Sequence, residues 1–161
     1  MNGSGSYNAS LPIGDLDSWT FTACAGDALR VRADEVAQTN NFAPWVRLYG
    51  PTGLLLGSVF GATSAEVSVV ATNRGTYLVV IANNDYYNNA GYGTYQLVVN
   101  GLSDGMKLCI PQISGTNANI GGIGGTPGAS YVLFTHTNIS TPVESWTPLV
   151  TNQFDSVGVF N

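Results

Sequence analysis

Charged side chains are scarce in this sequence. Asp, Glu, Lys and Arg make up 9% of its 161 residues, and the formal net charge is −5, whereas about 25% of the residues in an ordinary globular protein are charged. The five basic residues form no cluster; they are Arg30, Arg32, Arg47, Arg74 and Lys107. Because a nucleic-acid-binding surface needs clustered cations to neutralise phosphates, nucleic acid is excluded as a partner.

Long apolar runs are also missing. No run reaches the roughly 18 residues needed to cross a bilayer, so we predict no membrane insertion. Residues 1–10 lack the basic and apolar stretches of a signal peptide, and we expect the sequence to be that of a mature or truncated form. A polar but uncharged surface is commoner in extracellular proteins than in cytosolic enzymes, which favours a place outside the cell or on its surface.

Few residues are suited to catalysis. His136 is the only histidine, so no histidine cluster can hold zinc, and we expect it to be structural within a strand at 131–137. The glycine-rich run 121–125 is not followed by the Lys and Ser/Thr of a phosphate-binding loop, and it predicts a flexible turn. No segment resembles a nucleophile elbow. We therefore predict that the protein is not an enzyme.

The sequence contains two cysteines, Cys24 and Cys109. Their spacing fits neither a metal motif nor a redox motif. Two interpretations stay open: one disulfide that closes a long loop, or two buried thiols that act as small apolar side chains.

Short stretches of alternating apolar and polar residues recur at spacings of roughly ten residues, separated by Gly, Pro, Asn and Asp, which is typical of a β-sandwich or jelly roll. In 17–23, for example, Trp19, Phe21 and Ala23 share one face. The stretch 76–82 is apolar on both faces and predicts a central strand. The other strands predicted in this part are 28–33, 44–49, 54–56, 66–71 and 94–99.

The alternation breaks near residues 101–106, so we divide the chain into a first domain at 1–103 and a second at 104–161. The second contains few predicted strands, at 110–113, 131–137 and 145–151, with the start of a last hairpin at 153–161. So few strands make a thin core. The prediction is an all-β protein: a jelly-roll-like β-sandwich followed by a smaller, incomplete Ig-like β unit.

Five sequence groups in the first domain occur in a characteristic order. They are Asp15-x-Asp17-x-Trp19-x-Phe21, Ala25-Gly26-Asp27, Leu48-Tyr49-Gly50-Pro51-x-Gly53, Gly75-Thr76-Tyr77-x-Val79-x-Ile81 and Gly91-x-Gly93-x-Tyr95-x-Leu97. Over residues 7–100 this order resembles the bacterial pre-peptidase C-terminal domain family. The resemblance implies a non-catalytic, jelly-roll-like sandwich attached to secreted bacterial proteins. It also implies that calcium, polysaccharide or protein substrates are candidate ligands, because some family members bind them.

The second domain is similar to C-terminal β modules of large secreted proteins of environmental bacteria. The similarity rests on the groups 124–131, Thr137-Asn138, Pro142 and Trp146-Thr147. In that pattern further strands follow the stretch found here at 151–155, so the resemblance implies a truncated module. We consider three explanations: a short natural form, a fragment, and a subunit whose missing strand comes from a neighbour.

Two ligand sites are predicted at loops. Hard cations prefer oxygen ligands, and Asp15, Asp17, Asn83 and Asp85 are the candidates for calcium; the alternative is that Asp15 and Asp17 cap turns. The aromatic side chains that could stack on sugar rings are Tyr86, Tyr87 and Tyr92. The three tryptophans are expected to be core or interface anchors; they are Trp19, Trp45 and Trp146.

Exposed strand edges in a protein with so little charge invite strand addition between subunits, which predicts a homo-oligomer or polymer. The leading function is a non-catalytic extracellular structural or adhesive module, as a self-assembling surface or filament subunit that needs no cofactor. The alternative is a calcium-dependent accessory domain of a secreted hydrolase that binds polysaccharide or protein.

Overall fold

The computed structural model describes residues 4–37, 41–84, 91–102 and 105–160. Within these residues the chain is all-β apart from one short 3₁₀ helix, η1 (Val143–Ser145). None of the described helical segments is long and apolar enough to cross a membrane. The first eight strands are β1 (Gly5–Leu11), β2 (Asp17–Ala23), β3 (Ala28–Glu35), β4 (Pro44–Tyr49), β5 (Leu55–Phe60), β6 (Ser64–Val70), β7 (Gly75–Asn83) and β8 (Gly93–Asn100).

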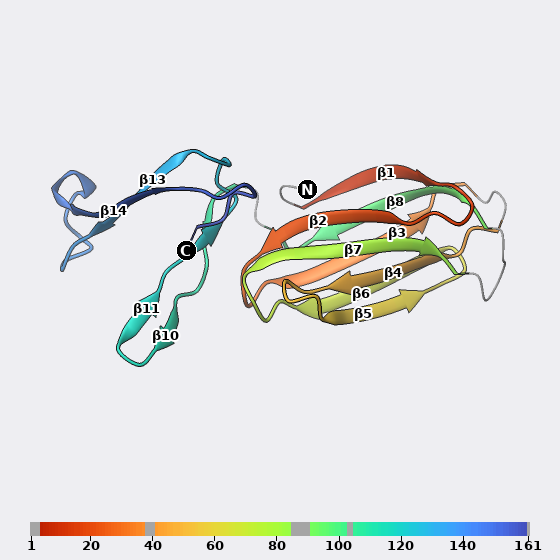
Figure 1. Ribbon diagram of the computed structural model, residues 1–161, viewed down its shortest axis with the longest axis horizontal. Helices are drawn as coiled ribbons and strands as arrows, with labels where there is room; N and C mark the ends of the chain where they lie inside the picture. Colours follow the sequence, from red (N-terminus) through yellow and green to blue (C-terminus); the bar gives the residue numbers. More distant parts are fainter. Residues whose placement is uncertain (1–3, 38–40, 85–90, 103–104, 161) are drawn as a thin grey trace.

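These eight strands form two antiparallel sheets of four strands each, which we call the sandwich (Figure 1). The strand orders are β1-β8-β3-β6 and β2-β7-β4-β5. The first strand pairs with the eighth, the second with the seventh, the third with the sixth and the fourth with the fifth. The chain is therefore one long antiparallel hairpin rolled into two layers, which is the topology of a jelly roll. The predicted fold class is confirmed.

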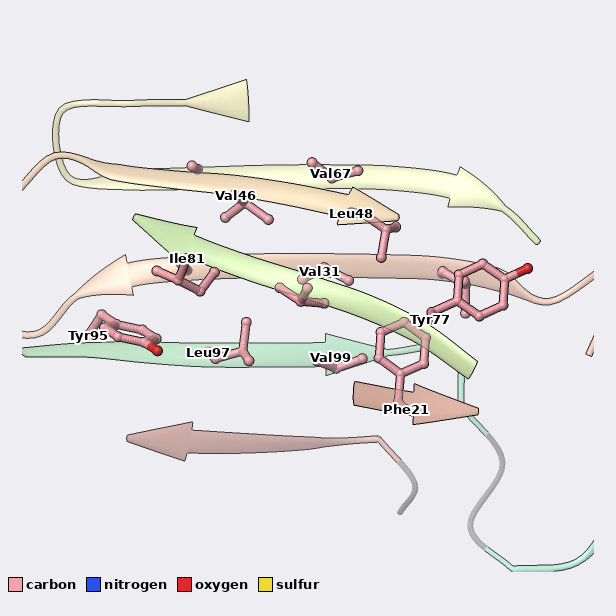
Figure 2. Packing of buried hydrophobic residues seen from close by; sticks show 14 of the residues in the cluster. Phe21, Val31, Val46, Leu48, Val67, Tyr77, Ile81, Tyr95, Leu97 and Val99 are labelled. Carbon is pink, nitrogen blue, oxygen red and sulfur yellow. The ribbon is translucent and has the colours of Figure 1, made fainter. Parts of the chain in front are cut away.

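The core of the sandwich lies between the two sheets, because apolar residues alternate with polar ones along most strands. Figure 2 shows Val46 and Leu48 of one sheet facing the layer that contains Val31, Leu97 and Val99 of the other. Strand β7 is hydrogen-bonded on both sides, to β2 and to β4. The stretch 76–82, which was predicted to be a central strand, therefore lies in an inner strand of its sheet.

Strand β1 lies in a segment where no strand was predicted. Its polar residues point outward, whereas Tyr7 and Ala9 pack against the core and Leu11 is fully buried. Backbone pairing with β8 fixes its register, with Tyr7 opposite Leu97. The outward-facing serine and asparagine residues gave the segment the composition of a loop and hid this alternation.

The chain after residue 104 forms three two-stranded sheets, which together we call the C-terminal unit. They pair β9 (Lys107–Leu108) with β12 (Gly122–Ile123), β10 (Gln112–Ser114) with β11 (Asn117–Asn119), and β13 (Ser130–Thr135) with β14 (Thr147–Gln153). The described part of this unit therefore lacks the two packed multistranded sheets of an Ig-like unit. Strands of two or three residues are too short to build them.

Three local predictions in the C-terminal unit need correction. The glycine-rich run is not simply a flexible turn: Gly122 and Ile123 form β12 and are buried, and a Cβ on Gly122 would lie 2.3 Å from the Phe160 ring. Glycine is needed there for close packing rather than for flexibility. The predicted strand at 145–151 starts later, because η1 occupies its first position. The predicted last hairpin is reduced to one bridge between Phe160 and Gly122.

Candidate interaction site

A disulfide bond joins the C-terminal unit to the sandwich. Cys24 directly follows β2, Cys109 directly follows β9, and the bond between them spans a Cα–Cα distance of 5.3 Å. Of the two interpretations of the cysteines, the structure contains the disulfide. Both residues are buried in a small cluster with Ile123 and Val159, which is separate from the core of the sandwich.

A partly buried ion pair lies beside this bond. The carboxylate of Asp27 accepts hydrogen bonds from the backbone N–H of Cys24 at 2.9 Å and from the Lys107 ammonium at 2.5 Å. Asp27 is only 8% exposed, and a buried charge is costly unless it is paired and hydrogen-bonded. The turn before β3 and strand β9 are therefore held together by charge as well as by a covalent bond.

The outer part of the C-terminal unit is a two-stranded ribbon, β13–β14. At its base, Tyr131 packs on Phe154 and Phe160, with ring centroids 5.0 and 4.6 Å apart. Beyond the base its apolar side chains are exposed, and Leu149 has an exposed fraction of 64%. The other large exposed apolar residues of the ribbon are Val132, Phe134 and Val150. An isolated two-stranded ribbon is only marginally stable in water, so contact with another surface would stabilise this one.

A groove separates the ribbon from the β10–β11 hairpin. Figure 1 shows the two hairpins diverging from their common base. The groove has a volume of about 560 Å³, and its apolar lining consists of Ala118, Ile120, Leu133 and Leu149. Its polar lining consists of Arg74, Gln112 and Asn119. The groove therefore combines an apolar wall with hydrogen-bond donors at one side.

Arg74, in the turn between β6 and β7, supplies the charge of this groove. The other basic residues are engaged: three form ion pairs with Glu66, Asp34 and Asp27, and the fourth, Arg47, lies over the Trp45 ring at 4.5 Å. No carboxylate of the described residues forms an ion pair with Arg74. A guanidinium that has no carboxylate partner among the described residues, and that lies beside two amide side chains, is suited to binding a carboxylate.

The described residues that were predicted to bind calcium each form a hydrogen bond with a different partner. The Asp17 carboxylate accepts a hydrogen bond from the Tyr95 hydroxyl at 2.6 Å, and Asn83 Oδ1 accepts one from the Ala43 backbone at 3.0 Å. Asp15 caps its own turn through the Leu16 N–H at 2.8 Å, and Asp85 lies outside the described residues. Among the described residues no group of three or more His, Cys, Asp or Glu side chains could hold a metal. Calcium binding stays a prediction.

The interactions of Asp17 involve a buried tyrosine. The Tyr95 hydroxyl donates to Asp17 and accepts a hydrogen bond from Trp19 Nε1 at 2.9 Å. Burial raises the pKa of Tyr95 well above its ordinary value, and the hydrogen bond to Asp17 raises it further. This network joins the two sheets near one end of the sandwich and is a structural feature.

The tyrosines predicted to stack on sugars are only partly placed. Tyr86 and Tyr87 lie outside the described residues. Tyr92, just before β8, is exposed. The described residues therefore do not bring a sugar-binding platform together, and this site also stays a prediction.

His136 follows β13 instead of lying within the predicted strand, which ends at Thr135. Its Nδ1 accepts a hydrogen bond from the Asn138 N–H at 2.9 Å, and its ring stacks on Trp146 with centroids 6.2 Å apart. The backbone turns there to enter the loop before η1. These contacts are those of a structural histidine at the tip of the ribbon.

Sequence reasoning did not identify the groove. Its lining comes from the β6–β7 turn, the β10–β11 hairpin and its exit, β13 and β14. These segments have no common motif, and the disulfide, the Asp27–Lys107 ion pair and the strand pairing bring them together. The available sequence signal for the groove is Arg74, a basic residue that follows Asn73 in a turn. Its sequence neighbours do not show which carboxylates lie near it in the folded protein.

No protein-family model matches the chain, and no curated protein matches it. Solved structures do match. The pre-peptidase C-terminal domain of a collagenase from Bacillus anthracis matches with a TM-score of 0.50 and 19% identity over 62% of this chain and 91% of that domain. A periplasmic inhibitor of g-type lysozyme from Aeromonas hydrophila matches with a TM-score of 0.45 and 16% identity, over 61% and 85% of the two chains. The first match shows that the chain contains a β-sandwich with the fold of a pre-peptidase C-terminal domain.

Proposed function

We propose that the protein is a non-catalytic, extracellular structural or adhesive module of a bacterium, which works by surface contact and assembles with further copies of itself. The observation that carries the proposal is the C-terminal unit, where an apolar ribbon and a groove stand uncovered beside a complete sandwich. Large exposed apolar surfaces rimmed by polar groups mark interaction sites in soluble proteins.

Two features support a place outside the cytoplasm. Disulfides persist in oxidising compartments and are rare in the cytosol, and the Cys24–Cys109 bond adds a covalent cross-link between the sandwich and the C-terminal unit. The low content of charge, 9% of the residues, is typical of extracellular β proteins rather than of cytosolic enzymes.

The ribbon supports contact with another protein. In the described structure β13 and β14 pair only with each other, so each has one edge without a strand partner. Unpaired edges accept strands from other chains, and apolar side chains on the same ribbon add hydrophobic burial to such a contact. Each large apolar side chain that becomes fully buried contributes about 1.5–3 kcal/mol.

Sedimentation velocity over a range of protein concentrations tests the proposal. We expect the wild type to form oligomers or polymers, and we expect Leu149→Asp to weaken them because the charge would have to be buried. Val70→Asp is the matched control: Val70 is 63% exposed, against 64% for Leu149, but it lies on the sandwich strand β6. A wild type that stays monomeric at every concentration, or equal effects of the two variants, would overturn the proposal.

A further inference from the structure

The loop between β1 and β2 presents a compact apolar and acidic tip. Ile13 and Leu16 are exposed by 60% and 57%, and Asp15 lies between them. The turn is closed by a hydrogen bond from the Asp15 N–H to the Pro12 carbonyl at 3.2 Å, with Gly14 at a φ of +74°. The loop therefore holds two apolar side chains and one carboxylate in a defined turn.

This tip and the groove lie at opposite ends of the molecule. Figure 1 shows the β1–β2 connection at the end of the sandwich away from β9–β14. Leu11, the last residue of β1, pairs with Gly93 at the start of β8, whereas Ala23, next to the disulfide, pairs with Gly75 at the start of β7. One copy therefore cannot bring its own tip into its own groove.

The two surfaces are complementary in charge and polarity. The groove offers the guanidinium of Arg74, for which the described residues supply no carboxylate, beside an apolar wall that includes Leu133 and Leu149. The tip offers a carboxylate between two exposed apolar side chains. Each surface presents what the other lacks, which is the pattern of a specific protein contact.

We propose that the β1–β2 loop of one copy binds in the groove of the next, with Asp15 pairing with Arg74 and with Ile13 and Leu16 packing on the ribbon. This inference rests on the proposed function and names the contact through which the module assembles. Because the two surfaces are different and lie at opposite ends, the contact does not close on itself in a dimer. Repetition of a head-to-tail contact generates an open chain of copies.

Charge reversal tests this pairing. We expect Asp15→Arg alone and Arg74→Asp alone each to lower the association constant at least tenfold, because like charges would then meet in the contact. An equimolar mixture of the two variants restores assembly, because every contact in an alternating chain again joins opposite charges. The double variant D15R/R74D restores it for the same reason. Assembly is measured by sedimentation velocity and by electron microscopy, and circular dichroism checks that each variant is folded.

Glu144→Arg is the control, because it changes the net charge as Asp15→Arg does, at an exposed residue outside the groove lining. We expect it to assemble like the wild type. If the wild type assembles but the single charge reversals do not weaken it, or neither the mixture nor the double variant restores assembly, this pairing is wrong while the proposed function stands. Closed dimers instead of chains would also overturn it and point to pairing of ribbon edges. A wild type that never assembles would overturn both.

Discussion

Removal of the disulfide is expected to release the C-terminal unit while the sandwich stays folded. The perturbation is the double variant Cys24→Ala/Cys109→Ala, which removes the bond and leaves two small apolar side chains. The sandwich has a large buried cluster between its sheets, whereas Cys109, Ile123 and Val159 of the C-terminal unit form only a small one with Cys24. The C-terminal unit, which has the smaller cluster, should unfold first.

The magnitude follows from the length of the loop. While the sandwich stays folded, Cys24 is fixed, and the segment that the bond closes runs from the end of β8 at Asn100 to Cys109. Closure of a loop of about ten residues stabilises the C-terminal unit by about 2.7 kcal/mol in the chain-entropy description. Whole small domains are stabilised by only about 5–15 kcal/mol. A loss of this size is therefore enough to unfold the C-terminal unit, even though the ion pair between Asp27 and Lys107 remains.

Amide hydrogen exchange measures the two units separately. We expect the protection of β9 and β12 to fall by about a hundredfold, which corresponds to the loss of roughly 2.7 kcal/mol. Strand β7, at the centre of the sandwich, should remain protected from exchange in the variant. Wild type treated with a reductant should behave like the variant. Complete loss of protection in β7 together with β12, or less than a tenfold loss in β12, would contradict this expectation.

Two further substitutions test other parts of the structure. Tyr95→Phe leaves Asp17 and Trp19 without their partner and should cost about 1–3 kcal/mol in the free energy of unfolding, measured by urea titration; an unchanged value would contradict this network. The same variant tests pH dependence, because the pKa of Tyr95 is raised in the folded state. The contribution of Tyr95 to the stability of the wild type is therefore fully present below the ordinary tyrosine pKa of 10.0 and is lost as the pH rises above it. This loss should be smaller in the variant. Gly122→Ala should destabilise the C-terminal unit by about 1–3 kcal/mol through overpacking against Phe160, which would be seen as faster amide exchange in β12. Gly115→Ala is the control, because a Cβ there meets nothing within 4 Å, and it should have only the smaller effect of its positive φ. Equal effects of the two variants would rule out the steric explanation.

Much of the sandwich could be predicted from the sequence because its strands are long and half-buried. Strand β2 matches its predicted bounds, and the doubly apolar stretch 76–82 lies within the central strand β7. Strand β1 was missed because the serine and asparagine residues of its outward face dominate its composition. The topology itself followed from the family resemblance and the spacing of the strands, whereas the register needed the structure.

The C-terminal unit and the groove could not be predicted in the same way. Strands of two residues, such as β9 and β12, have no periodicity that a sequence pattern can show. Gly122 lies in a glycine-rich run that is typical of a flexible loop, but the reason for a glycine at this position is its close contact with Phe160. Which carboxylates of the described residues lie near Arg74 depends on the folded structure, so in the sequence this residue is only one of five scattered cations.

The proposed assembly requires the C-terminal ribbon to be a contact surface. Amide hydrogen exchange of β13 and β14 tests it most directly, when it is measured at protein concentrations below and above the onset of assembly. We expect amides of the ribbon to exchange rapidly in the dilute protein and to become protected as it assembles, while those of β7 are protected throughout. Ribbon amides that exchange at the same rate at all concentrations, in a protein that has assembled, would contradict it.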